Sequence, residues 1–191
     1  MPPADPSLAA VETFISRWTS REGGAERANY QMFLSELCDT LGVARPDPSG
    51  SERDYNDYVF ERAVRPRDGD GTAPKRIDLY KKDAFVLVAK QSRLADEPAV
   101  LGKRNIARGW DVMMKNARQQ AETYVFLLDA NHPAPPFIIV CDVGHCLELF
   151  PTSRAPAAPM AISRTAMATA SISRICAGKD PRASQDDLAS T

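Results

Sequence analysis

The sequence has few of the residues from which metal and redox sites are often built. Among its 191 residues there are two histidines and four cysteines, and no two cysteines stand in a C-x-x-C spacing. His132 follows Asn131 in a proline-rich loop, where we expect it to be solvated, and neither histidine has partner spacing for a metal site or a triad. The thiols are expected to be reduced and mostly buried, because the chain carries no secretory signal.

Long apolar runs and a strong charge of one sign are also missing. No run is long enough to span a membrane, and the start MPPADPS lacks the basic region and apolar core of a secretory signal. The formal net charge is −1, which argues against an indiscriminate nucleic-acid binder. These absences predict a cytoplasmic protein that does not interact with membranes.

Aromatic residues are absent from the whole of segment 151–191, which is rich in Ala, Ser, Thr and Pro and has no lasting periodicity. Such a segment buries too little apolar surface to offset the entropy of ordering, so it predicts a disordered tail. The remaining chain divides into a short N-terminal extension with a helix start, residues 1–13, and one domain, residues 14–150.

Within that domain, hydrophobic periodicity and punctuation predict helices over residues 7–19, 25–41 and 106–128, and strands over residues 58–64, 76–82, 84–92, 136–144 and 145–150. Ser7 is a plausible N-cap, and Gly42 ends the second helix. This order predicts an α/β fold with a mixed sheet of about five strands flanked by helices. It is the order common to restriction-endonuclease-like cores.

The stretch RIDLYKKDAFVLVAKQ, residues 76–91, is the most informative part of the chain. It has the layout of the PD-(D/E)xK nuclease core, in which an Asp on one strand is followed about ten residues later by an acid-x-Lys triplet. Asp78 and Lys90 match this layout, but Val88 stands where the second acid is required. The alternative is that FVLVAK is an ordinary buried strand with no catalytic role, because hairpins in which an Asp and a Lys flank a turn are common.

The chemistry explains why position 88 matters. Phosphodiester hydrolysis at neutral pH uses Mg²⁺, which prefers carboxylate oxygens and substrate phosphate as ligands. Asp78 and an acid at position 88 would share that metal, and Lys90 would orient the attacking water and balance negative charge in the transition state. Valine offers no lone pair, so we expect metal affinity to collapse.

Positive charge is concentrated around this hairpin. Residues 75–118 contain eleven Lys and Arg against five Asp and Glu. A locally basic face suits contact with the phosphates of double-stranded DNA, although a solvated face of mixed charge is an equal alternative. The candidate DNA-binding residues are Lys75, Arg76, Lys81, Lys82, Lys103 and Arg104.

Five segments in this order resemble the N-terminal region of MmeI-like type II restriction–modification enzymes, which carry an adenine-specific DNA methyltransferase downstream. They are AERANYQMFLSELCDTLGV, YVFERAV, RIDLYKKDAFVLVAKQS, RGWDVMMKNARQQAETYVFLL and PPFIIVCDVGHCLELF. The resemblance implies a Mg²⁺-dependent nuclease site, and S-adenosylmethionine only in the intact parent protein.

The resemblance also assigns residues. It implies that Asp78 and Lys90 are cleavage residues, with a Glu expected where Val88 stands. Gln120 matches a Gln on the core helix, and Glu36 lies on a helix where such folds often carry a further acid. Taken as residues alone, Glu36 fits a packing-face acid better than a ligand, and Gln120 fits a polar surface residue equally well.

The tail has a second interpretation. Members of this family continue past the equivalent of HCLELF into a segment like ADFSGTG. Loss of one base just after the Phe150 codon would allow residues 151–176 to be re-read as ADFSGTGRAYGHFPDRDGYRFDLEDL without conflict. We therefore predict that segment 151–191 is out of frame and that the chain is a truncated gene product.

Three functions follow from these observations. The first is a degenerate nuclease-like domain that neither cuts DNA nor, lacking F-x-G-x-G and N-P-P-[FY] motifs, methylates it. The second is an active nuclease in which another acid, Glu36 or Glu61, serves the metal. The third is a non-catalytic DNA-binding or assembly module. The recognition sequence and the oligomeric state cannot be predicted from this sequence.

Overall fold

The fold comes from a computed structural model that describes residues 7–19, 26–65, 73–92, 103–152 and 173–176. The helices are α1 (Leu8–Thr19), α2 (Glu26–Thr40), the short 3-10 helix η1 (Arg53–Tyr55) and α3 (Lys103–Leu127). The strands are β1 (Tyr58–Val64), β2 (Lys75–Lys81), β3 (Phe85–Lys90), β4 (Phe137–Asp142), β5 (Cys146–Pro151) and β6 (Ser173–Cys176). No helix within the described ranges is long and apolar enough to cross a membrane.

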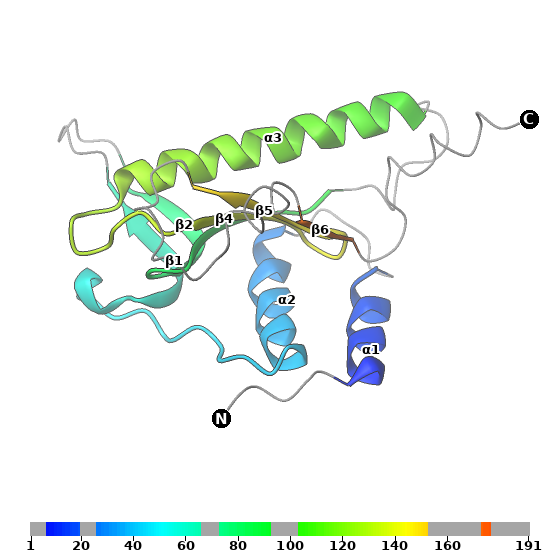
Figure 1. Ribbon diagram of the computed structural model, residues 1–191, viewed down its shortest axis with the longest axis horizontal. Coiled ribbons are helices and arrows are strands. Elements are labelled where there is room, and N and C mark those ends of the chain that lie inside the picture. Colours follow the sequence, from blue (N-terminus) through cyan, green and yellow to red (C-terminus); the bar gives the residue numbers. More distant parts are fainter. Residues whose placement is uncertain (1–6, 20–25, 66–72, 93–102, 153–172, 177–191) are drawn as a thin grey trace, which may run out of the picture.

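All six strands form one mixed sheet in the order β1-β2-β3-β4-β5-β6. Only β3 and β4 pair in parallel, and α3 makes the crossover that a parallel pair requires. Figure 1 shows α3 lying over one face of the sheet, with α1 and α2 on the opposite face. The predicted α/β fold, with helices flanking a mixed sheet, is confirmed, and the sheet has one strand more than the five expected.

The additional strand, β6, lies in the segment for which the sequence predicts a disordered tail. It pairs antiparallel with β5, and Ile175 stands opposite Leu147. The unpaired backbone of β5 is a ready template for another strand, so four residues can join the sheet without a core of their own. Pro151 and Thr152, at the start of the predicted tail, are also described, and Pro151 ends β5. Residues 153–172 and 177–191 of the predicted tail lie outside the described residues.

Helix ends follow the predicted capping chemistry. The Ser7 hydroxyl accepts a hydrogen bond from the Ala10 amide at 3.2 Å, which confirms Ser7 as the N-cap of α1. Gly42 has φ of 65°, and the Val43 amide donates to the Cys38 carbonyl at 3.0 Å. The helix α2 therefore ends with a residue in the left-handed conformation just beyond its last turn, a position at which glycine is favoured.

The sheet is buried on both faces. Along β3, Val86 and Val88 pack under α3, whereas Leu87 and Ala89 face the side of α1 and α2. A strand covered on both faces reads as a continuous apolar run, which explains the sequence FVLVAK. Three cysteines are free and buried, as predicted; these are Cys38, Cys141 and Cys146.

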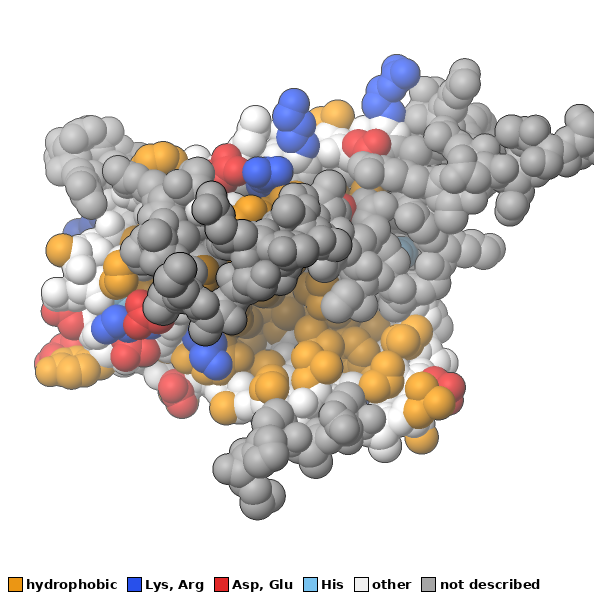
Figure 2. Space-filling view, in the orientation of Figure 1, with side chains coloured by type: hydrophobic (Ala, Val, Ile, Leu, Met, Phe, Trp, Pro, Cys, Tyr) orange, Lys and Arg blue, Asp and Glu red, His pale blue; other side chains and the backbone are white. Residues whose placement is uncertain are grey.

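The two N-terminal helices pack together through aromatic contacts. The Phe33 ring lies 5.2 Å from the rings of both Phe14 and Trp18, measured between centroids. An apolar cavity of about 180 Å³ lies between these helices and the turn joining β4 to β5. Figure 2 shows hydrophobic side chains gathered around a hollow on this side of the sheet.

His132 differs from the prediction. The sequence suggests a solvated loop residue, but the side chain is 0% exposed. Its Nδ1 lies 3.1 Å from the Tyr80 hydroxyl, and its ring packs edge-on against the Tyr80 ring. The proline-rich loop after α3 folds back over β2, which a local reading of loop composition does not reveal.

Candidate functional site

A cavity of about 590 Å³ brings together residues that are far apart in the sequence. Among its lining residues are Asp78 from β2, Lys90 from β3 and Gln120 from α3, three of the predicted site residues. Arg76, one of the predicted DNA-binding residues, also lines it. The remaining lining residues are Tyr30, Glu61, Pro74 and Tyr124.

The cavity lies where β2 and β3 diverge. Their backbone ladder runs from Lys81 opposite Phe85 to Leu79 opposite Leu87. At the next position of β2, the Asp78 carboxylate accepts a hydrogen bond from the Ala89 amide at 2.7 Å. A carboxylate thus takes the place of the backbone carbonyl that would accept this hydrogen bond in a regular sheet. Side chains from both helical layers line the opening, Tyr30 from α2 and Gln120 from α3.

Position 88 lies beside the β3 residue that Asp78 contacts. The paired register of β2 and β3 ends at Leu79 opposite Leu87, and Val88 directly precedes Ala89, whose amide donates a hydrogen bond to the Asp78 carboxylate. Val88 itself is 0% exposed and belongs to the apolar cluster under α3. The residue that replaces the expected acid is therefore part of the core.

A different carboxylate lies on the other side of Asp78. On β1, Phe60 stands opposite Leu79 and Arg62 stands opposite Ile77, and Glu61 lies between these two positions. It is thus opposite Asp78, and its φ of 53° is unusual for a residue that is not glycine. Such a backbone costs about 1–3 kcal/mol and often marks functional sites.

The Glu61 carboxylate already has partners. It accepts a short hydrogen bond from the Tyr30 hydroxyl, and its Oε2 lies 3.9 Å from Arg76 Nε. Arg76 Nη1 also donates to the Glu61 carbonyl at 3.2 Å. Burial, followed by the bond to Glu61, holds the pKa of Tyr30 well above its usual value, so the phenol stays protonated as a donor.

Lys90 is placed by a buried anchor that the sequence reading missed. Its backbone stands opposite Asp142 of β4 in the register of the sheet, and its carbonyl accepts a hydrogen bond from the Val143 amide at 2.7 Å. The buried Asp142 carboxylate accepts from Ser92 N at 2.8 Å, Ser92 Oγ at 2.7 Å and Trp110 Nε1 at 2.7 Å. The only sign of this anchor in the sequence is an acid at the end of the apolar run FIIVC. The groups that donate hydrogen bonds to it come from distant segments, so the sequence does not reveal them.

Gln120 reaches the cavity from α3. Its Nε2 donates to the Tyr124 hydroxyl at 2.6 Å, one helical turn away. Residues four apart share one helix face, so both side chains point toward the opening between β2 and β3. Gln120 therefore lies at the cavity, and its role there stays a prediction.

Glu36 lies apart from this group. Its carboxylate accepts from Trp18 Nε1 at 2.8 Å and lies 3.1 Å from Arg17 Nη2. It joins α1 to α2 and is not among the residues that line the cavity. The geometry therefore favours the packing-face interpretation of Glu36 over a role as a metal ligand.

The predicted DNA-binding residues separate into groups. Lys75 and Arg76 begin β2 on the cavity side, whereas Lys81 and Lys82 lie at the opposite end of the strand. Lys81 Nζ lies 4.5 Å from the centre of the Tyr58 ring, and Lys82 Nζ lies 3.6 Å from Asp57 Oδ1. Lys103 and Arg104 lie in the first turn of α3, and their side chains are outside the described part of the structure.

Comparison with known proteins identifies the family. The chain matches the family described as MmeI, N-terminal domain, over residues 6–174. No curated protein and no solved structure matched the chain. The match covers most of the sequence and includes every strand that surrounds the cavity. The chain therefore belongs to the MmeI N-terminal domain family and represents a region of a restriction–modification enzyme.

Proposed function

We propose that this chain is a nuclease-like domain that binds double-stranded DNA at the Asp78–Lys90 cavity but has lost efficient cleavage. One observation carries the proposal. Asp78, Lys90 and Gln120 come from three elements to line one cavity, while the valine at position 88, where the layout requires the second acid, is buried in the core. The parts that position a phosphate are present, and a carboxylate needed for the metal is replaced.

The cavity chemistry supports a phosphate ligand. Arg76 and Lys90 supply positive charge, and a guanidinium can form paired hydrogen bonds with phosphate oxygens. Asp78 would give one carboxylate oxygen to Mg²⁺, and Lys90 would orient the attacking water. With Asp78 as the one acid that the β2–β3 hairpin contributes to the cavity lining, the cation is held weakly, because Mg²⁺ sites rely on charged oxygen ligands.

Glu61 favours a second candidate, an active nuclease with a relocated acid. It lines the cavity opposite Asp78 and has the unusual backbone described above. Against this role stands the engagement of its carboxylate by Tyr30 and Arg76, because the Arg76 guanidinium, 3.9 Å from Oε2, opposes a second cation at the same carboxylate. Glu36, the other acid considered, lies outside the cavity.

Metal titration separates the two candidates. In calorimetry with Mn²⁺, we expect the wild-type chain to bind weakly and Val88→Glu to gain affinity by roughly tenfold or more, since it restores the carboxylate that the nuclease layout has at position 88. Val88→Gln is the matched control, because it has the same size without the charge. Tight wild-type binding that Glu61→Gln abolishes would instead establish the relocated acid.

Folding of the variants must be checked, because Val88 is fully buried. A polar side chain at a buried position costs about 1–3 kcal/mol if it stays unpaired. Thermal unfolding in chelator should show a loss for both variants, and a larger one for Val88→Glu, because a carboxylate costs more to bury than an amide. If both fold and neither gains Mn²⁺ affinity over wild type, the assignment of this cavity as a nuclease-like site is wrong.

A further inference from the structure

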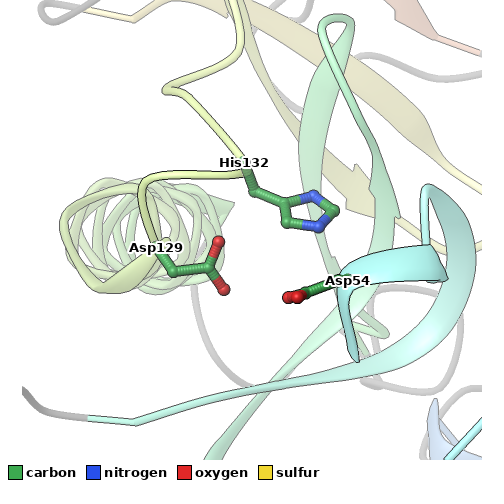
Figure 3. Close-up of side chains that lie close together, drawn as sticks. All are labelled: Asp54, Asp129 and His132. Carbon is green, nitrogen blue, oxygen red and sulfur yellow. The ribbon is translucent and has the colours of Figure 1, made fainter. Parts of the chain in front are cut away.

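A second cluster of metal-ligating side chains lies outside the nuclease-like cavity. Asp54 belongs to η1, and Asp129 and His132 lie in the loop that follows α3. One potential ligand atom from each residue lies within 4.8 Å of the others. Figure 3 shows the imidazole and the two carboxylates facing a common space from separate segments of the chain.

His132 supplies an independent reason to expect a ligand there. Its side chain is 0% exposed, and Nε2 is buried with no hydrogen-bond partner among the described residues. Leaving a buried polar nitrogen unpaired costs about 1–3 kcal/mol, so native structures rarely keep one without a function or a bound species. A cation between His132 and the two carboxylates would satisfy this nitrogen.

The other ring nitrogen is arranged as in many metal-bound histidines. Nδ1 lies 3.1 Å from the Tyr80 hydroxyl and 4.0 Å from Asp57 Oδ1. When Nδ1 carries the proton and donates it to an oxygen, the Nε2 lone pair is available to a metal. Burial lowers the pKa of His132, with a further contribution from Arg62, which also favours the neutral ring that a metal requires.

We propose that Asp54, Asp129 and His132 form a second cation site, which takes a transition-metal dication of the Zn²⁺ class. The donor set of one imidazole and two carboxylates suits such ions better than Mg²⁺, which prefers oxygen ligands alone. The ion would tie η1 to the loop after α3, close to the end of β2. Neither the charge pattern nor the spacing in the sequence points to this site.

Positive groups near the cluster set the limit on its affinity. Arg62 Nη2 lies 3.8 Å from Asp129 Oδ2, and Lys82 Nζ lies 3.6 Å from Asp57 Oδ1. These two cations lie beside three carboxylates, those of Asp54, Asp57 and Asp129, so the formal net charge of the five groups is −1. The Arg62 guanidinium also lies over the Tyr80 ring at 4.8 Å, which holds it beside the cluster. The site can therefore accept a dication, although with less attraction than three uncompensated acids would give.

The experiment is a Zn²⁺ titration of the full chain after chelator treatment, in a buffer that does not bind zinc. We expect one binding event that Asp54→Asn and Asp129→Asn each weaken by roughly tenfold or more. Both acids are exposed, so these changes should leave the fold intact. Zinc should also raise the unfolding temperature of wild type more than that of either variant.

A control variant separates this site from other acids. Asp39→Asn makes the same chemical change at an exposed acid paired with Arg45. It should bind Zn²⁺ like wild type. The proposal is overturned if the wild-type chain does not bind Zn²⁺, or if Asp54→Asn and Asp129→Asn bind it as tightly as wild type does.

Discussion

At the scale of single residues, the proposed function depends on Asp78 and on the residues at positions 88 and 61. Val88 on β3 offers no ligand, and Glu61 on β1 offers a carboxylate that Tyr30 and Arg76 already engage. On the proposed function, a site without the second acid should bind phosphate through its cations more readily than it binds Mg²⁺. We therefore expect DNA affinity without turnover.

Lys90 gives the sharpest test of DNA binding at this scale. Lys90→Ala should weaken binding to a DNA duplex and reduce the salt dependence of the affinity by about one phosphate contact. Fluorescence anisotropy at several salt concentrations measures both quantities. Lys81→Ala is the matched control, since it removes the same charge from the far end of β2, where the ammonium rests over Tyr58. Equal losses for the two variants would show that DNA does not select the cavity.

The sequence predicts some residues of the candidate site but not the surroundings of others. The Asp78–Lys90 pair and Gln120 follow from spacing and resemblance, and the cavity joins all three. The sequence offers Glu61 only as an alternative acid, because a distorted strand position leaves no mark in a pattern of residue types. It predicts a solvated His132, because the burial of this side chain depends on contact with Tyr80, 52 positions away.

At the scale of elements, hydrophobic period and capping predicted most of the fold. The strand predicted for residues 58–64 has the same bounds as β1, and the helices agree with α1 and α2 to within a residue or so. The strand β6 was missed, because the short segment SRIC has no periodic core of its own and depends on the edge of β5. Long-range pairing of this kind is not encoded locally.

The contact between α1 and the turn after β4 depends on one glycine. Gly144 has φ of 80°, and a Cβ there would lie 2.6 Å from the Trp18 carbonyl oxygen. We expect Gly144→Ala to destabilise the chain by about 2–4 kcal/mol, from backbone strain together with displacement of α1. Urea unfolding monitored by tryptophan fluorescence measures the change.

A second glycine provides the control for this prediction. Gly109 lies within α3, and a Cβ there meets nothing within 4 Å. Gly109→Ala should stabilise the chain by about 0.5–1 kcal/mol, because alanine is the better helix former. If the two variants had the same stability, α1 would not be held at the β4–β5 turn in the way described.

At the scale of the whole molecule, the C-terminal segment is the open question. The family match reaches residue 174, and β6 extends the sheet beyond Phe150, the point after which the sequence suggests a change of reading frame. Both observations associate residues beyond Phe150 with the domain, and the frame change stays a prediction.

The coding DNA decides the matter. The frame-change prediction requires that the shifted frame after the Phe150 codon reads ADFSGTG and continues into F-x-G-x-G and N-P-P-[FY] motifs. A shifted frame that soon reaches stop codons would make segment 151–191 native. The domain would then stand as a DNA-binding module with its own sixth strand.

On the proposed function, the nuclease-like cavity lacks its second acid at position 88, so a carboxylate there should restore cleavage. The most direct measurement is nicking of supercoiled plasmid with Mn²⁺ by wild type, Val88→Glu, and Val88→Glu combined with Lys90→Ala. We predict no nicking by wild type, detectable nicking by Val88→Glu, and none by the double variant. Nicking by wild type at the rate of Val88→Glu would contradict the claim, as would a folded, Mn²⁺-binding Val88→Glu variant that never cuts.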